Sequence, residues 1–154
     1  MNASVQSAKG GAIYAALLTP QGKYLHDFFI AELAESFYLD CEASRIDDLF
    51  KRLRMYKMRS KVELEIVDDM AVAVFFGSYI HDALSIKKEA GSAFDWLGGV
   101  LYTDPRLTGI GARAMIPTDS FEIALRDEGF SAASFEDYDE LRLSLGLPDS
   151  SRDL

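Results

Sequence analysis

The sequence predicts an α+β fold, in which a mostly antiparallel sheet has helices packed on one face. Two observations predict it. Apolar runs of strand length follow one another across short turns, as in β-hairpins, before and after a single helical stretch at about residues 46–59. The regular strand–helix–strand alternation of a parallel nucleotide-binding sheet is missing, which argues against that class.

The first expected element is a β-hairpin formed by residues 12–18 and 24–30. Both runs are apolar, and Pro20 and Gly22 lie between them. Proline presets φ at the second position of a turn and glycine closes the turn, so Lys23 is expected at the lip of the hairpin.

A third strand is expected over residues 36–42, and a helix follows it. Ser44 is expected to cap this helix, in which apolar residues recur at helical spacing up to an end near Arg59. The period changes to two over residues 61–67, where charged and apolar side chains alternate, which predicts a half-exposed strand. After a turn, residues 70–76 are expected to form the next strand.

The pattern is looser in the second half of the chain. The elements expected there are a loop or short helix over 80–93 and strands over 98–103 and 112–116. Ser134 is expected to cap a last helix, which Gly146 and Pro148 end. We therefore expect two units, one at 1–77 and an incomplete one at 78–154.

Composition narrows the classes of function. The chain has 154 residues, 49% of them hydrophobic, which is enough for a sizeable core. It has no apolar run of about 18–20 residues, so no membrane partner is expected. The start of the chain does not resemble a signal peptide and the single cysteine offers no internal disulfide, so a cytoplasmic location is expected. A net charge of -9 argues against general nucleic-acid binding.

The single cysteine is expected to be a small core residue. Cys41 lies between Asp40 and Glu42, and these carboxylates raise the pKa of a thiol. A catalytic or metal-binding cysteine needs cationic neighbours or partner ligands. With one cysteine and two distant histidines, neither a catalytic residue nor a metal site is expected.

The two histidines have carboxylate neighbours in the sequence. Since successive residues of a strand point to opposite faces, His26 and Asp27 are not expected to touch, and a structural role for His26 is favoured over proton transfer. His81 falls in an expected loop, where a solvated side chain is the default.

One short stretch departs from the acidic average. Six cations occur within eleven residues that contain no acid: Lys51, Arg52, Arg54, Lys57, Arg59 and Lys61. Cations near a helix C-terminus are favoured by the helix dipole, which explains part of the run. The alternative is an anion site, and with it an RNA- or protein-binding module that uses the basic 51–61 face.

Four segments occur in order along the chain: AIYAALLTPQGKYLHDFF (12–29), LRMYKMRSKV (53–62), DPRL (104–107) and YDELRLSLGLP (138–148). They resemble the YgfZ branch of the YgfZ/GcvT folate-binding, aminomethyltransferase-related family. The resemblance implies that family's folate-binding fold, with tetrahydrofolate, a reduced folate, as cofactor. It also implies a non-catalytic role in supporting iron–sulfur cluster assembly or repair, and through it tRNA modification.

The resemblance also implies partners and a missing part. The partners are reduced folate, iron–sulfur assembly proteins and tRNA. Members of the family continue into a Lys-Gly-Cys-Tyr-x-Gly-Gln-Glu signature, and this chain stops before it, so we expect a fragment that lacks the motif. Cys41 does not occupy that motif. An incomplete second unit should expose apolar surface, which predicts a homo-oligomer.

The related glycine-cleavage enzyme has paired aspartates where this chain has His26 and Asp27, and a glutamate where it has Ser144. These departures argue against the alternative of a folate-dependent aminomethyltransferase, since acid–base groups are lost. Asp27 is expected to accept hydrogen bonds from the pterin, and Arg59 or Arg142 to bind the glutamate tail. The expected cofactor-binding residues are Lys23, His26, Asp27, Arg59 and Arg142.

Overall fold

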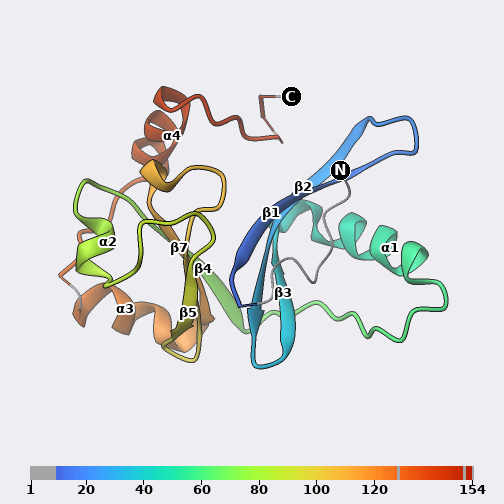
Figure 1. Cartoon of the computed structure of the whole chain (residues 1–154), viewed down its shortest axis with the longest axis horizontal. Helices are drawn as coiled ribbons and strands as arrows, with labels where there is room; N and C mark the ends of the chain where they lie inside the picture. Colours follow the sequence, from blue (N-terminus) through green and yellow to red (C-terminus); the bar gives the residue numbers. More distant parts are fainter. Residues whose placement is uncertain (1–9, 128, 151, 154) are drawn as a thin grey trace.

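The computed structural model describes residues 10–127, 129–150 and 152–153, and these form two antiparallel sheets (Figure 1). The first sheet has the order β1-β2-β3, with β1 at Ala12–Leu18, β2 at Tyr24–Leu33 and β3 at Ser36–Asp40. The second has the order β4-β7-β6-β5, with β4 at Met70–Phe75, β5 at Ala93–Trp96, β6 at Gly99–Thr103 and β7 at Ala112–Pro117. The predicted α+β class is confirmed.

Three helices, α1, α2 and α3, lie on the outer sides of the two sheets, and α4 lies beyond one end of the second sheet (Figure 1). Their bounds are α1 at Ile46–Lys57, α2 at Ile80–Ala83, α3 at Phe121–Asp127 and α4 at Phe135–Ser144. In Figure 1, α1 lies beside the first sheet and α2 and α3 lie beside the second, so the order of layers is helix, sheet, sheet, helix. None of the helices in the described ranges is long and apolar enough to cross a bilayer.

The alternation of side chains along β2 produces two cores. Phe28 and Ile30 pack with Leu49 of α1 on one face of the first sheet. Phe29 and Ala31 point to the other face, because successive strand residues alternate. They pack with residues of both sheets in a cluster whose remaining buried members are Ala12, Val100, Tyr102 and Met115.

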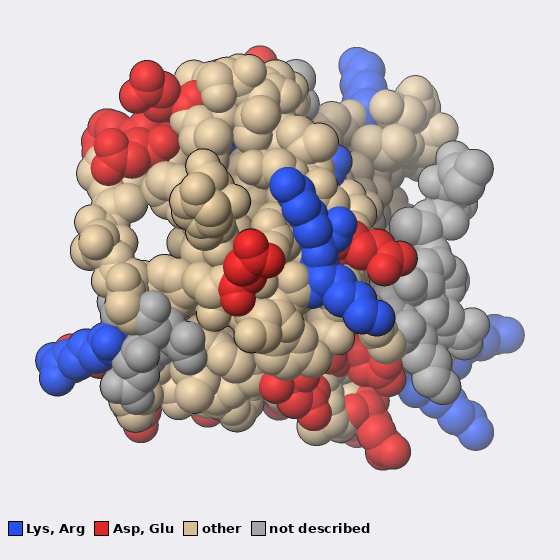
Figure 2. Space-filling model, turned by 60° about the vertical axis from the view of Figure 1, so that its left-hand side comes forward, with Lys and Arg blue, Asp and Glu red and all other residues tan. Residues whose placement is uncertain are grey.

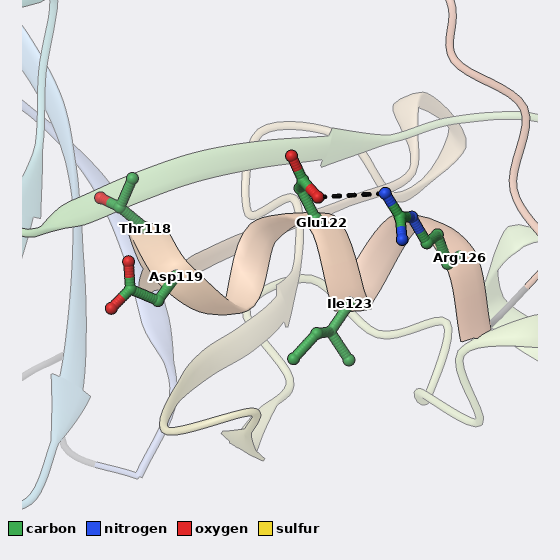
Figure 3. Close-up of a pocket in the computed structure, with 5 residues that line it drawn as sticks. All are labelled: Thr118, Asp119, Glu122, Ile123 and Arg126. Carbon is green, nitrogen blue, oxygen red and sulfur yellow. Dashed lines mark hydrogen bonds and ion pairs between the residues drawn. The ribbon is translucent and has the colours of Figure 1, made fainter.

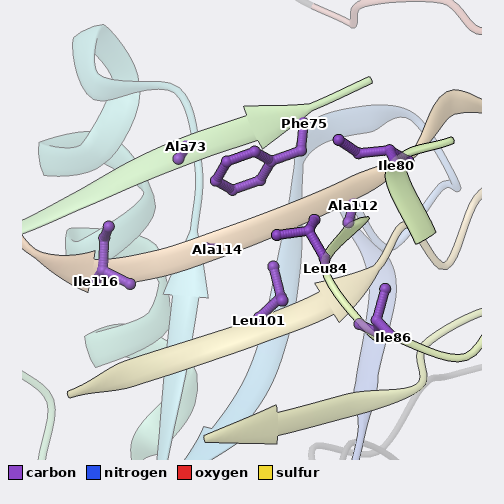
Figure 4. Packing of buried hydrophobic residues seen from close by; sticks show 9 residues of the cluster. All are labelled: Ala73, Phe75, Ile80, Leu84, Ile86, Leu101, Ala112, Ala114 and Ile116. Atoms are coloured by element: carbon purple, nitrogen blue, oxygen red, sulfur yellow. The ribbon is translucent and has the colours of Figure 1, made fainter. Parts of the chain in front are cut away.

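A third cluster fills the outer face of the second sheet (Figure 4). Phe75 and Leu101 lie at its centre, and small side chains on β4 and β7 leave room for the helix that covers them. The covering residues Ile80, Leu84 and Ile86 come from α2 and the turn after it.

The predicted strand at residues 61–67 does not form. No hydrogen bond among the described residues involves this segment, which runs as an open connection from α1 to β4. The alternating pattern is present, but no strand of the described residues pairs with it, and Val62 and Ile66 remain 50% and 41% exposed. A strand is stabilised by cross-strand neighbours, and the part of the chain that the structure describes supplies none to this segment.

The two helix-capping predictions have different outcomes. Ser44 does not cap α1, because a 3₁₀ turn at Ala43–Arg45 precedes the helix and the Ser44 hydroxyl bonds to Glu42 instead. Ser134 caps α4 as predicted: its side chain accepts from the backbone N–H of Asp137 in a complete capping box.

The prediction for the end of α1 near Arg59 is two residues too long. The helix ends at Lys57 because Met58 has a φ of 42°, outside the helical region. Two further elements, β5 and α3, are both short and were not predicted from the sequence. Residues 70–75, assigned to the unit at 1–77, pair with β7 in the second sheet, and the two-unit division stays a prediction.

Candidate functional site

Asp27 lies at the centre of a hydrogen-bonded cluster between the first sheet and the C-terminal segment. Its carboxylate accepts hydrogen bonds from the hydroxyls of Tyr14, Tyr24 and Ser150, with an Oη–Oδ1 distance of 2.8 Å for Tyr24. The Tyr24 hydroxyl also bonds to Ser150. Both strands of the first hairpin and a segment more than a hundred residues away thus meet at one carboxylate.

The register of the first hairpin places both tyrosines beside Asp27. Ala16 pairs with Asp27 and Tyr14 pairs with Phe29, so Tyr14 is the diagonal neighbour of Asp27 on the same face. In a regular strand Tyr24, three residues before Asp27, would point to the opposite face. The register shift between β1 and β2 beside Tyr24 is a β-bulge, which re-aims such a side chain.

The electrostatics of the cluster hold the carboxylate ionised. Partial burial of Asp27 raises its pKa, but hydrogen bonds from Ser150, Tyr14 and Tyr24 outweigh it and lower the pKa below the usual 3.8. Burial and the hydrogen bond to Asp27 raise the pKa of Tyr14 above its usual 10.0. At neutral pH the cluster is therefore one carboxylate acceptor facing protonated hydroxyl donors.

Two guanidinium groups lie over the rings of this cluster. The Arg45 Cζ lies 5.8 Å from the ring centre of Tyr24, and its guanidinium donates to the Leu25 carbonyl. The Arg106 Cζ lies 5.6 Å from the ring centre of Tyr14. Cations at these distances from aromatic rings are attracted by the ring quadrupole. The cluster therefore combines an acceptor, aromatic surface and positive charge.

Arg106 is held in place by its own ion pair. Its Nη2 lies 2.8 Å from Oδ2 of Asp104, a side chain only 1% exposed, and donates to the Tyr138 hydroxyl at 3.1 Å. The Arg106 Cζ also lies 4.8 Å from the ring centre of Phe29. The second sheet and α4 thus fix a cation against the first sheet.

A second ion pair joins the two sheets directly. The guanidinium of Arg113 on β7 donates from Nη2 to Oδ2 of Asp40 on β3 at 2.5 Å, and both side chains are almost fully buried. Its Cζ lies 4.2 Å from the ring centre of Phe29, which therefore contacts both Arg106 and Arg113. Asp40 raises the pKa of Arg113 against the effect of burial, so the guanidinium stays charged.

His26 lies on the other face of the sheet, as predicted. It is 3% exposed, and its Nε2 is 2.7 Å from Oδ2 of Asp48 on α1. Asp48 also pairs with Arg52 at 2.6 Å. His26 therefore belongs to the packing of α1 against the sheet and does not share the Asp27 cluster.

The three predicted cations do not meet at Asp27. Lys23 is exposed at the hairpin turn, where its backbone N–H donates to the Thr19 hydroxyl. Arg59 is exposed beyond the end of α1. Arg142 is 3% exposed. Among the described residues, no hydrogen bond or ion pair joins Lys23, Arg59 or Arg142 to Asp27.

Arg142 instead organises the chain that follows α4. Its guanidinium bonds to Asp139 at 2.7 Å, to Asp153 at 2.5 Å and to the Leu147 carbonyl at 3.0 Å. These contacts fix the segment that delivers Ser150 to Asp27.

Sequence reasoning missed four members of the cluster. Tyr14 could have been predicted, because side chains alternate between the two faces of a hairpin and the register places Tyr14 diagonal to Asp27 on one face. Arg45, Arg106 and Ser150 carry no local signal, since each reaches the hairpin only through tertiary packing.

Cys41 lies at the end of the first sheet and packs, half-buried, on its α1 side. Burial and the neighbouring Asp40 and Glu42 raise the pKa of the thiol to about 11. The thiol is thus protonated at neutral pH. In the ranges that the structure describes, no group of three or more His, Cys, Asp or Glu side chains is placed to hold a metal ion.

The prediction of a solvated His81 is wrong. His81 lies in α2 and is 9% exposed. The nearby Ile80 and Leu84 belong to the hydrophobic cluster on the outer face of the second sheet. The His81 Nε2 is buried and has no hydrogen-bond partner among the described residues. Burial lowers its pKa below 6.5, and the charge of Lys88 lowers it further. The local sequence gave no sign of this, because the burial depends on packing of the whole helix.

This burial predicts a pH dependence of stability. As pH falls from about 6.5 toward the lowered pKa of His81 in the folded chain, the unfolded chain protonates this side chain before the folded chain does, so the unfolded state binds more protons and stability falls as pH falls through this window. The slope from this one group is at most about 1.4 kcal/mol per pH unit. Urea unfolding at several pH values should show a shallower decline for His81→Leu than for the wild type. Equal slopes would contradict the prediction.

Two open hollows lie on the outer helices. One of about 610 Å³ is lined by Thr118, Asp119, Glu122, Ile123 and Arg126 (Figure 3). One of about 360 Å³ is lined by Phe50, Lys51, Arg54 and Met55. None of the predicted binding residues lines either hollow. On the face shown in Figure 2, acidic side chains gather toward the edges of a largely uncharged surface, from which a few cations project.

No protein-family model matches the chain. The chain is similar to the mitochondrial iron–sulfur cluster assembly factor IBA57 of Homo sapiens, with 29% identity over 148 residues, which cover 92% of this chain and 39% of that protein. The Mus musculus factor is 28% identical over 151 residues, covering 93% of this chain and 40% of that protein. The IBA57 homolog of Neurospora crassa is 26% identical over 149 residues, covering 92% and 34%.

The chain therefore spans about two fifths of the length of the first two relatives. The names of these relatives also correct one prediction from the sequence. All three are named as mitochondrial proteins, which overturns the expected cytoplasmic location.

Proposed function

We propose that this chain supports iron–sulfur cluster assembly as a folate-binding accessory protein that is not itself catalytic. The observation that carries the proposal is its similarity, along 92% of its length, to proteins named as iron–sulfur cluster assembly factors. Its partners on this proposal are reduced folate and iron–sulfur assembly proteins, and tRNA modification benefits indirectly through the clusters that are assembled.

The Asp27 cluster is the proposed folate contact. A carboxylate only accepts hydrogen bonds, which matches the N–H donors on the edge of a pterin. Tyr14 is 37% exposed and offers a ring face beside that carboxylate. Ser150 already donates to Asp27, so a pterin N–H would take the place of the Ser150 hydroxyl. The residues present therefore fit the polar edge of a folate once the C-terminal contact yields.

The remaining predicted contacts have unequal support. Lys23 and Arg59 are exposed cations that are free to meet a glutamate tail. Arg142 would first have to leave Asp139 and Asp153. His26 would contribute only by holding α1 against the hairpin.

Two features support a non-catalytic role over aminomethyl transfer. His26 stands at the position of one family carboxylate and is buried on the face of the sheet opposite Asp27. Ser144 stands at the other, and its hydroxyl donates to the Leu141 carbonyl at 2.7 Å within α4. Neither group is placed to exchange a proton beside Asp27, which general acid–base catalysis requires.

Calorimetric titration of the purified chain with 5-formyltetrahydrofolate tests the proposal. Saturable one-to-one binding is expected. Asp27→Asn keeps the shape of the side chain but removes its charge, and we expect it to weaken binding about tenfold or more, the usual effect of losing a charge-assisted hydrogen bond. Asp69→Asn is the matched control, since Asp69 is an exposed carboxylate outside the cluster.

Thermal unfolding of each variant must accompany the titration, because Asp27 also holds three hydroxyls of the fold. Ser150→Ala adds a second readout: removing the competing hydroxyl should leave binding intact or tighten it. Absence of binding by the folded wild-type chain, or equal affinity of Asp27→Asn and the wild type, would refute the folate contact.

A further inference from the structure

The turn that follows β6 carries a cation to the edge of the Asp27 cluster. Arg106 belongs to this turn, and its side chain is 13% exposed. Its Cζ lies 5.6 Å from the ring centre of Tyr14 and 4.8 Å from that of Phe29. The hydroxyl of the same Tyr14 donates to Asp27. The guanidinium of Arg106 is therefore separated from the proposed folate contact by a single aromatic ring.

The local sequence fixes the direction of this guanidinium. The Asp104 carboxylate accepts from the backbone N–H of Arg106 at 2.9 Å, and from its Nε and Nη2 at 3.1 Å and 2.8 Å. Two parallel N–H donors on one carboxylate set the plane of a guanidinium as well as its position. The Tyr138 hydroxyl of α4 accepts from Nη2 at 3.1 Å. Arg106 is thus held more firmly than neutralising the charge of Asp104 requires.

Stability alone does not explain a buried ion pair of this kind. Removing two charges from water costs about as much as their attraction returns, so an apolar pair of similar size can often replace them without loss. An apolar pair lacks the directional hydrogen bonds of a guanidinium. A fixed guanidinium over a ring attracts that ring through its quadrupole, and so restricts the positions that the ring adopts.

Tyr14 is a side chain that needs such a restriction. It is 37% exposed on β1, and its ring packs at 5.2 Å from the ring of Phe29 as well as under Arg106. A half-exposed tyrosine has several staggered rotamers, and some of them point the hydroxyl into solvent. With Arg106 removed, less of the ring is held and those rotamers become accessible.

The charge of Arg106 acts on Tyr14 in the same direction as its packing. Burial and the hydrogen bond to Asp27 raise the pKa of Tyr14, and the positive charge of Arg106 lowers it. A phenol whose pKa is lower is a better hydrogen-bond donor. The guanidinium therefore favours both the position and the strength of the bond from Tyr14 to Asp27.

We propose that Arg106 is a positioning residue, whose guanidinium holds the Tyr14 ring so that the Tyr14 hydroxyl stays bonded to Asp27. The effect passes from the turn after β6 to a carboxylate on β2. A carboxylate that is fixed before its ligand arrives loses less conformational freedom on binding, so the affinity is higher. The effect on folate affinity rests on the proposed function, whereas the placement of Tyr14 does not.

A paired variant separates positioning from the effect of an unpaired charge. Arg106→Met alone leaves the buried Asp104 carboxylate without its counter-charge, which strongly destabilises a fold. The test therefore uses Arg106→Met with Asp104→Asn, since asparagine still accepts from the backbone N–H of residue 106. This variant removes one charge of each sign, so the net charge beside Tyr14 is unchanged.

The other buried ion pair at Phe29 supplies the matched control. Arg113 lies 4.2 Å from the ring centre of Phe29 and pairs with Asp40. Among the described contacts its guanidinium does not lie over Tyr14. Arg113→Met with Asp40→Leu thus removes a comparable pair between the sheets and leaves Arg106 in place. Circular dichroism verifies that both paired variants are folded.

The carbon-13 shift of the Tyr14 Cζ measures the placement of the hydroxyl without any ligand. A phenol that donates to a carboxylate carries more negative charge on its oxygen, which moves this signal downfield of free tyrosine. Its loss in Tyr14→Phe assigns the signal. We expect the Arg106 paired variant to move it toward free tyrosine and the Arg113 paired variant to leave it unchanged. An unmoved signal in the first, or an equal shift in the second, would overturn the proposal.

Titration with 5-formyltetrahydrofolate measures the consequence for binding. The Arg106 paired variant and Tyr14→Phe should each raise the Kd about three- to tenfold, the usual effect of leaving one side chain mobile before binding. Adding Tyr14→Phe to the paired variant should raise the Kd no further, because both changes remove the same hydrogen bond.

The two measurements fail in different ways. Additive losses of affinity would show that Arg106 acts by a route other than Tyr14, and would contradict the proposal. A folded wild type that does not bind the folate would refute the proposed function instead. The Tyr14 Cζ shift would then still decide whether Arg106 positions the hydroxyl.

Discussion

Replacing Arg113 with methionine should cost about 3–5 kcal/mol of unfolding free energy, the usual penalty for leaving one member of a buried ion pair without its partner. Methionine keeps much of the apolar stem that packs beside Phe29, but the Asp40 carboxylate, with a side chain 8% exposed, then has no counter-charge. Urea unfolding followed by circular dichroism measures the loss.

Two further variants separate charge from packing. Arg113→Met with Asp40→Leu removes both charges, and its stability should return to near the wild-type value, because an apolar pair of similar size can replace a buried ion pair. Arg126→Met breaks a pair in which both side chains are 78% exposed, so it should cost less than about 1 kcal/mol. If Arg113→Met with Asp40→Leu is as unstable as Arg113→Met alone, the loss does not come from the uncompensated charge of Asp40, and the prediction is wrong.

The second large effect is expected at Gly111, which precedes β7. Its φ is 119°, a conformation that side chains rarely adopt, and a Cβ there would lie well inside contact distance of the Phe75 carbonyl oxygen. Gly111→Ala should therefore cost about 2–5 kcal/mol, from backbone strain and from displacement of β4.

Gly109→Ala, two residues earlier, is the control. Nothing lies within 4 Å of a Cβ at Gly109, and its φ is not in the left-handed region. Its stability should stay close to the wild-type value or rise slightly, since alanine restricts the unfolded chain. Thermal unfolding of both variants under one condition measures the difference in stability. Equal losses of stability in the two variants would contradict a special steric constraint at Gly111.

Local patterns predict the elements whose stabilising contacts are local. The first hairpin follows from Pro20 and Gly22 between two apolar runs, and the start of α4 follows from its capping box. The segment 61–67 has an equally clear pattern and forms no strand, because its missing contacts would come from a partner strand. A pattern shows which face is apolar, but it does not show whether a neighbour exists.

The candidate site divides in the same way. The opposite orientation of His26 and Asp27 follows from strand geometry alone. The contacts of Asp27 with Tyr24 and Ser150 do not, because one depends on a β-bulge and the other on a segment more than a hundred residues away. Prediction therefore found the carboxylate and missed most of the groups that bond to it.

The contact between Asp27 and Ser150 also has a consequence for the order of events during synthesis. The two residues are 123 positions apart, so both sheets and α4 are translated before Ser150 leaves the ribosome. Domains can begin folding while the chain is still growing, and the hairpin with Asp27 emerges well before Ser150. Until Ser150 has been translated, this carboxylate therefore has one hydroxyl donor fewer, and the nascent hairpin must tolerate an acid whose hydrogen bonds a much later segment completes.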